Sequence, residues 1–157
     1  MSIDWSVRMD TNKPAQDVIE LLAKRFLTKI ENRDEVYSTR VPESLISVTG
    51  ENKISKISKM LMLESYKLNL KLDVDFADYR GRVEEKDEDN RIGKGIAITL
   101  KEVDGDAVVL FDGEITIAQR NNGELLVQDK EYEWLKEELD KAGLKYKKQR
   151  LPSPFVE

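Results

Sequence analysis

The sequence predicts an α+β fold, in which an antiparallel, largely meander β-sheet carries about three helices packed on one face. Strand-like alternation and helix-like spacing of apolar residues follow one another along the 157 residues. Asp-Gly and Asn-Gly pairs join neighbouring apolar runs, as in β-hairpins. No Gly/Ser-rich linker or change of composition divides the chain. We therefore expect a single domain over residues 1–157, a length that allows a sizeable core.

The first strand and helix are indicated by a change of period. Residues 3–9 alternate between apolar and polar types, the period of a half-buried strand. Pro14 suits the first turn of a helix, where its missing N–H costs nothing. Apolar residues at helical spacing follow as far as Phe26, so we expect a helix near residues 14–30.

The next part of the chain is less regular. Residues 31–44 are polar and indicate a connection with room for one short strand, and residues 45–49 indicate a strand that Gly50 closes. Residues 51–64 contain the triplet Ile-Ser-Lys twice. This spaces Ile54, Ile57 and Leu61 like one face of a helix.

The most regular pattern lies at residues 66–76. Six apolar residues alternate with five polar ones, which predicts a long strand with one apolar and one polar face. A helix would scatter these residues around its circumference. We expect the polar face to meet water, as antiparallel sheets permit.

The second half begins with an acidic run that suits the start of a helix near residues 88–103. Gly93 and Gly95 weaken this helix and would let it lie close against the sheet. Three strands of a meander follow, turned at Asp112-Gly113 and Asn121-Asn122-Gly123. A last helix is expected near residues 131–142, and the tail, residues 144–157, adds a short edge strand and an irregular end.

Composition excludes several kinds of chemistry. The chain has no cysteine and no histidine, so thiol nucleophiles, Cys/His zinc sites and Ser-His-Asp triads are impossible. The net charge of −5, from 26 basic and 31 acidic side chains, disfavours nonspecific nucleic-acid binding and favours a basic protein partner. No signal-peptide pattern opens the sequence and no apolar run approaches membrane-spanning length. We expect a cytoplasmic protein that binds neither nucleic acid nor membrane.

Carboxylates on the long strand are the candidate functional side chains. Asp73 and Asp75 are two residues apart and so share one strand face, with Asp78 shortly after. A solvated face is the simplest interpretation. A patch that attracts a basic partner and a carboxylate pair for Mg²⁺ or acid–base work are alternatives. We predict no catalytic, metal or cofactor site.

Three passages resemble the immunity proteins of the Sit toxin family, known from myxobacterial contact-dependent kin discrimination. Residues 1–22 resemble the family's opening strand, turn and first helix. Residues 70–81 resemble its long central strand, and residues 105–127 its Gly-Asp-Ala strand, Gly-Glu corner and second strand. Residues 33–64 depart from the family's pattern.

The resemblance implies an immunity protein that binds and neutralises a cognate bacterial toxin by contact, without catalysis or cofactor. From charge and position, and not from the family, we expect the contact face to be the polar side and end of the long strand: Asp73, Asp75, Asp78, Tyr79 and Arg80. The toxin is expected to be basic. A small-ligand or regulatory binding domain and a carboxylate-dependent enzyme remain alternatives.

Overall fold

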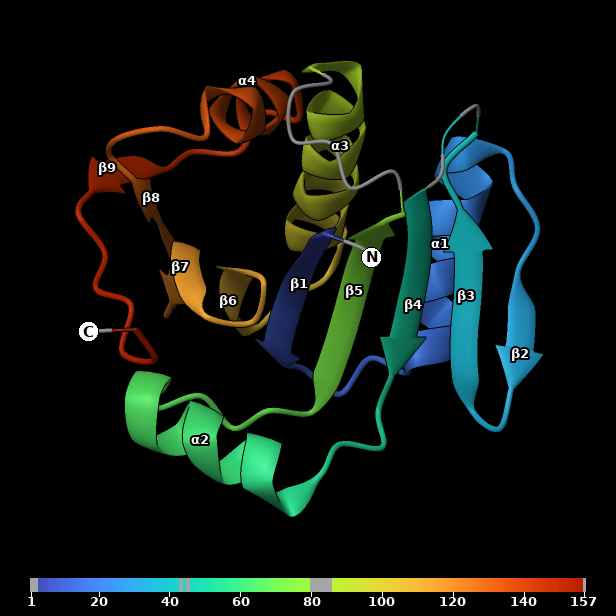
Figure 1. Ribbon diagram of the computed structural model, residues 1–157, viewed down its shortest axis with the longest axis horizontal. Coiled ribbons are helices and arrows are strands. Elements are labelled where there is room, and N and C mark those ends of the chain that lie inside the picture. Colours follow the sequence, from blue (N-terminus) through green and yellow to red (C-terminus); the bar gives the residue numbers. More distant parts are fainter. Residues whose placement is uncertain (1–2, 43, 45, 80–85, 157) are drawn as a thin grey trace.

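A single nine-stranded sheet runs through the protein, with helices on both of its faces (Figure 1). The structure is a computed structural model that describes residues 3–42, 44, 46–79 and 86–156, with residues 86–88 as backbone only. The strands are β1 (Ile3–Asp10), β2 (Glu31–Arg33), β3 (Val36–Arg40), β4 (Ile46–Glu51), β5 (Leu72–Asp78), β6 (Asp106–Phe111), β7 (Ile115–Asn121), β8 (Glu124–Gln128) and β9 (Lys147–Gln149). The helices are α1 (Ala15–Phe26), α2 (Lys56–Tyr66), α3 (Lys86–Glu102) and α4 (Glu133–Lys141).

The predicted fold class is confirmed, but the sheet is not a simple meander. Its strand order is β2-β3-β4-β5-β1-β6-β7-β8-β9, so β1 lies at the centre between β5 and β6. Both neighbours run antiparallel to β1. The chain therefore crosses over β1 through α3 to go from β5 to β6. The edge strand β9 pairs with β8 in parallel, which makes the sheet mixed.

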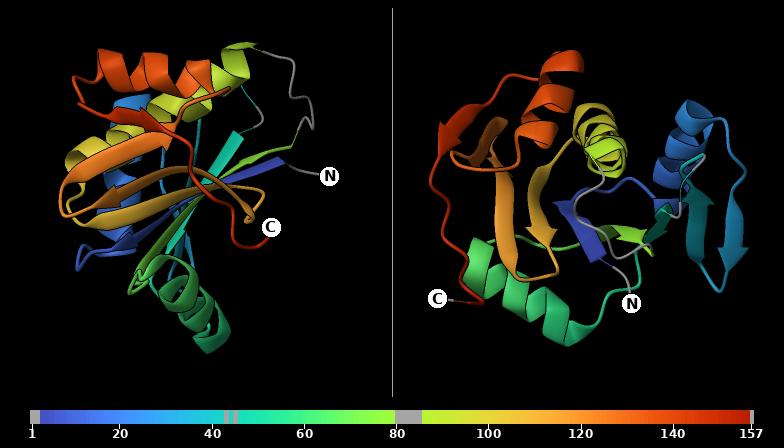
Figure 2. Two further views of the ribbon diagram at one scale, coloured as in Figure 1. Left: turned by 90° about the vertical axis from the view of Figure 1, so that its left-hand side faces the viewer. Right: turned by 45° about the horizontal axis from the view of Figure 1, so that its top comes forward.

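Three helices cover one face of the sheet, and the fourth lies on the other (Figures 1 and 2). The side chains of α1, α3 and α4 share the main core with the inward residues of the central strands. A second, smaller cluster joins Met62 and Tyr66 of α2 to Val108 and Leu110 of β6. The sequence predicted about three helices, all on one face. The described chain has four, and α2 lies on the opposite face from the other three.

Close backbone approach explains why α3 carries two glycines. A Cβ atom on Gly95 would lie 3.1 Å from Cζ of Phe76 in β5, and one on Gly93 would lie 3.1 Å from Cε3 of Trp134 in α4. The prediction that these glycines let the helix lie close to the sheet is confirmed for Gly95, whereas Gly93 allows close approach to α4. Farther along, α4 ends as predicted, because Gly143 takes a left-handed conformation with a φ of 76°.

The predicted strand at residues 66–76 is wrong in its first half. Tyr66 still belongs to α2, and Lys67 ends that helix in a left-handed conformation. Residues 67–71 form no strand, although Leu68 and Leu70 are buried against α2. From Leu72 onward the apolar side chains enter the main core on the opposite face. The regular alternation therefore joins two segments that bury their apolar residues in different clusters.

Candidate functional site

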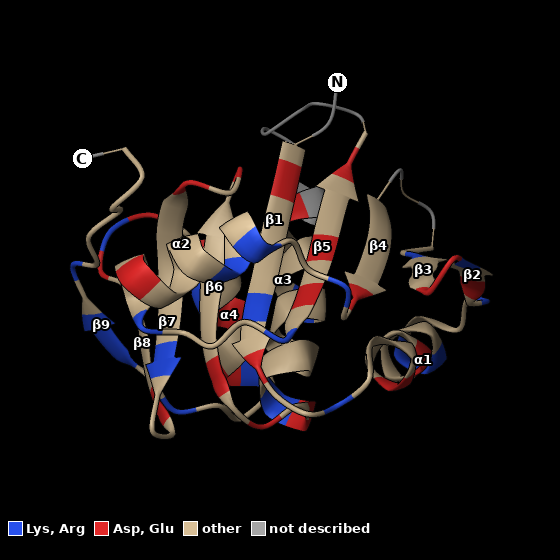
Figure 3. Ribbon diagram, turned by 90° about the horizontal axis from the view of Figure 1, so that it is seen from below, with Lys and Arg blue, Asp and Glu red and all other residues tan. Residues whose placement is uncertain are grey.

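On the α2 side of the sheet, polar residues of three neighbouring strands lie together. Asp73 and Asp75 of β5 alternate with the core residues Leu72 and Val74 and so point to this side. Across the strand pairs, Asp73 lies opposite Arg8 and Glu51, and Asp75 lies opposite Ser6 and Thr49. Figure 3 shows this face, where β1 lies between α2 and the acidic segments of β5. We call Asp4, Glu51, Asp73 and Asp75 the acidic strip.

The two central aspartates are not free in solvent, so the prediction of a solvated face is wrong. Only 14% of the Asp73 side chain is exposed, and Nε of Arg8 lies 3.6 Å from its Oδ2. Burial raises the pKa of Asp73 to about 6, although Arg8 lowers it. Burial and then the charge of Asp73 raise the pKa of Asp75 to about 7. Four carboxylates share the strip with the guanidinium of Arg8, so ionisation leaves excess negative charge there.

Polar atoms of this region also lack hydrogen-bond partners. Among the described side chains, five buried nitrogen or oxygen atoms have none, and three of them are Ser6 Oγ, Arg8 Nε and Asp73 Oδ1. Ser6 is 3% exposed and lies opposite Asp75 in the pairing of β1 with β5. Buried polar groups are normally hydrogen-bonded, because a buried polar group without a hydrogen bond costs free energy. The unsatisfied atoms are therefore concentrated beside the two aspartates.

The neighbouring helix α2 exposes apolar side chains. It begins at Ser55, whose side chain accepts a hydrogen bond from the backbone N–H of Ser58, and it buries Met62 and Tyr66. The rest of the helix surface carries four apolar residues whose exposed fractions are between 41% and 67%. We call them the apolar ridge: Ile57, Met60, Leu61 and Leu63. The Nη1 atom of Arg8 donates to Sδ of Met62 at 3.4 Å, so the helix contacts the arginine that pairs with Asp73 of the strip.

The predicted contact residues do not all lie on one side of the sheet. The structure brings Asp73 and Asp75 together on the α2 side. Asp78 lies in register with Ile3 and Ile46 and, like Leu72, Val74 and Phe76, is buried on the alternate side of β5. Tyr79 is exposed just beyond the strand. Arg80 lies outside the described residues.

Sequence reasoning missed the partners of the aspartates and the ridge. Ser6 and Arg8 come from a strand 65 or more residues earlier in the chain, and no local pattern links them to β5. A signal for the ridge does exist. Residues 60–63 are four consecutive apolar residues, more than a helix with one buried face requires.

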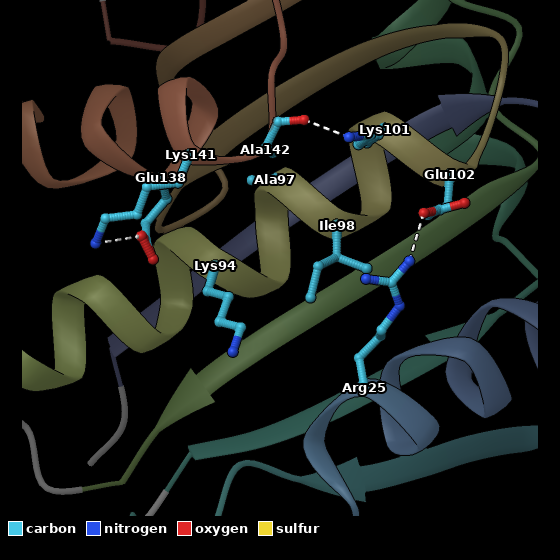
Figure 4. A pocket seen from close by; sticks show the side chains of 9 residues that line it. All are labelled: Arg25, Lys94, Ala97, Ile98, Lys101, Glu102, Glu138, Lys141 and Ala142. Atoms are coloured by element: carbon cyan, nitrogen blue, oxygen red, sulfur yellow. Dashed lines mark hydrogen bonds and ion pairs between the residues drawn. The ribbon is translucent and has the colours of Figure 1, made fainter.

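A groove lies on the other side of the protein, between α1, α3 and α4. Its volume is about 540 Å³ and most of its lining is charged. Figure 4 shows that four of these charges form two ion pairs: Arg25 lies 2.7 Å from Glu102, and Lys141 lies 3.3 Å from Glu138. Such a groove does not match the apolar pocket with a few convergent polar groups that small ligands favour.

In the part of the chain that the structure describes, no group of three or more carboxylates is arranged to hold a metal ion. None of the described helices is both long and apolar enough to cross a bilayer.

Comparison with known proteins identifies a family. The family model described as SitI3-like matches residues 3–138. No curated protein and no solved structure gives a significant match. The matched segment runs from β1 into α4 and includes the acidic strip and the apolar ridge. Because the match spans most of the sequence, this chain belongs to the SitI3-like family, a family of immunity type.

Proposed function

We propose that this protein is an immunity protein, which binds a cognate bacterial toxin in the cytoplasm and neutralises it by contact, without chemistry of its own. The observation that carries the proposal is the family match over residues 3–138. The name of the family points to immunity, and the resemblance to Sit immunity proteins implies a toxin as the target. Binding either covers the active site of the toxin or blocks a surface that the toxin needs.

Charge supports a basic toxin. The protein carries a net charge of −5, and the acidic strip gathers four carboxylates on one face. Opposite charges on two partners raise their association rate and fix their relative orientation. We propose Asp73 and Asp75 as the centre of the contact face. Tyr79, at the exposed end of β5, is proposed as part of its border.

A carboxylate-dependent enzyme is the second candidate, because one observation favours it. Raised pKa values on a close carboxylate pair are typical of acid–base sites, and Asp73 and Asp75 have them. Structural charge networks raise pKa values in the same way. The groove between α1, α3 and α4 lies on the opposite side of the sheet and is lined by other residues. For these reasons we rank catalysis below binding.

Co-expression tests the proposed function. The open reading frame immediately upstream of the gene is the source of the candidate toxin, whose C-terminal domain is expressed in bacterial cells with and without this chain. We expect the wild-type chain to restore growth. Failure to rescue, with both proteins detected in the soluble fraction, would count against an immunity function. Growth restored by direct contact should be accompanied by co-purification of the two proteins, whereas an enzyme that repairs toxin damage would rescue without a complex.

A further inference from the structure

Two neighbouring features on the α2 side of the sheet lack a partner in the described chain: the apolar ridge, and the unsatisfied polar atoms of Ser6, Arg8 and Asp73 at the acidic strip. We infer that they form one docking surface for a basic polypeptide. The ridge receives apolar side chains of the toxin, and one arginine or lysine of the toxin lies between Asp73 and Asp75. This inference rests on the proposed function and adds the place and the chemistry of toxin binding.

The ridge has the form of an interface helix. Met62 and Tyr66 attach α2 to the sheet through Val108 and Leu110. The four ridge residues are on other flanks of the helix and remain between 41% and 67% exposed. Single exposed apolar residues are common on protein surfaces, but a contiguous group of them marks an interaction site. An amphipathic helix commonly binds by its apolar residues at i, i+3 and i+4, the spacing of Ile57, Met60 and Leu61.

The strip supplies acceptors that a cation would satisfy. Oγ of Ser6 and Oδ1 of Asp73 are buried without a hydrogen bond. The side chain of Asp75 forms no hydrogen bond or ion pair with a described residue. Arg8 acts on it through its charge but contacts Asp73 and Met62. A guanidinium has five N–H donors and no acceptor, so it complements a site of carboxylate and hydroxyl oxygens.

Charge favours a basic polypeptide over a second copy of this chain. Homodimer interfaces are mostly isologous, so a second copy would bring the same acidic strip to the interface. The net charge of −5 on each copy would add repulsion. A basic toxin brings the opposite charge to the strip and can bury the ridge at the same time.

The test compares affinities for the purified toxin domain encoded upstream, measured by isothermal titration calorimetry with the full chain. The ridge variant carries Met60→Gln and Leu63→Gln, and the strip variant is Asp75→Asn. Leu27→Gln is the matched control, because Leu27 is an apolar side chain with 92% exposure at the end of α1, on the other side of the sheet.

We expect the ridge variant and Asp75→Asn each to weaken binding at least about tenfold, as replacement of central interface residues does. The control should stay within about twofold. The loss caused by Asp75→Asn should shrink when salt rises from about 0.1 M to about 1 M, because salt screens the charge pair. Circular dichroism confirms that each variant is folded.

Each outcome has one meaning. If the wild-type chain binds the toxin domain but both site variants bind equally well, this inference is overturned and the proposed function stands. If the wild-type chain does not bind, the proposed function fails and the inference fails with it. If sedimentation shows a wild-type dimer that the ridge variant breaks, the ridge serves a second copy, and the inference is again overturned.

Discussion

Replacing Asp75 by asparagine should make the protein more stable at alkaline pH. Burial and the nearby charge of Asp73 raise the pKa of Asp75 to about 7 in the folded protein. The folded state therefore holds this proton more tightly than the unfolded chain does. Ionisation of Asp75 lowers the free energy of unfolding as pH rises from about 4 to about 7, and the full cost applies above that range.

The expected magnitude follows from the size of the pKa shift. One pKa unit corresponds to about 1.4 kcal/mol, so a rise from 3.8 to about 7 corresponds to about 4 kcal/mol at alkaline pH. Part of this cost is shared with Asp73, since the two carboxyl groups repel each other. The Asp75→Asn change keeps the side-chain shape and removes the charge. We expect it to raise the free energy of unfolding by about 2–4 kcal/mol near pH 8, and by less than about 2 kcal/mol near pH 5.

Urea unfolding at these two pH values measures the effect. Asp129→Asn is the control, because Asp129 is exposed in a loop, and it should change the free energy of unfolding by no more than about 0.5 kcal/mol. A loss of stability near pH 8 would refute the reasoning. A gain of the same size at both pH values would refute it too, because the gain must grow as Asp75 ionises.

Three further substitutions test the packing that positions the site, again by urea unfolding. Gly95→Ala should lower the free energy of unfolding by about 1–3 kcal/mol, because the added Cβ meets the Phe76 ring and this outweighs the better helix propensity of alanine. Adding Phe76→Leu to the same chain should recover part of the loss. Arg120→Gln should cost about 2–3 kcal/mol, because this guanidinium donates to three backbone carbonyls at and just beyond the end of α3, and an unchanged stability would contradict that role. Met62→Ala should cost about 2–5 kcal/mol, and Met60→Ala no more than about 0.5 kcal/mol. Equal losses at these two methionines would mean that α2 is not oriented as described.

Local sequence patterns predicted a helix or strand well where a single apolar–polar period covered that helix or strand and nothing else. The alternation of residues 3–9 gave β1, and the Asp-Gly and Asn-Gly turns gave the meander from β6 to β8. The same reasoning failed at residues 66–71, where Leu68 and Leu70 alternate like a strand but belong to a connection without regular structure that packs with α2. Alternation reports an extended chain with one buried side. It does not report which cluster buries it or whether another strand pairs with it.

Long-range placement could not be predicted from these patterns. The central position of β1 depends on its pairing with β5 and β6, strands that are more than 60 residues away in sequence. Likewise, the spacing of Ile57 and Leu61 showed that α2 has an apolar face, but not that this face would be exposed while Met62 is buried. Both features are decided by contacts between distant segments, about which helix and strand periods say nothing.

The candidate site was predictable in part. Spacing alone placed Asp73 and Asp75 on one side of a strand, and the structure agrees. The same parity argument separates Asp78 from them, because it lies an odd number of residues away. Their partial burial was not predictable, since it depends on Arg8 from another strand and on the position of α2.

Two of the buried charges in the described chain are better satisfied than Asp73, whose Oδ1 has no hydrogen-bond partner. Lys136 is buried as well, yet its Nζ donates to two backbone carbonyls and to a carboxylate. Arg120 likewise uses all of its nitrogen atoms. The fold can therefore supply partners for buried charge, but it leaves Ser6, Asp73 and Asp75 without enough of them. Functional sites commonly keep such a cost in stability. A bound cation would remove the repulsion and satisfy the oxygens at once, so the carboxylate that weakens the free protein is the same one that would strengthen the complex.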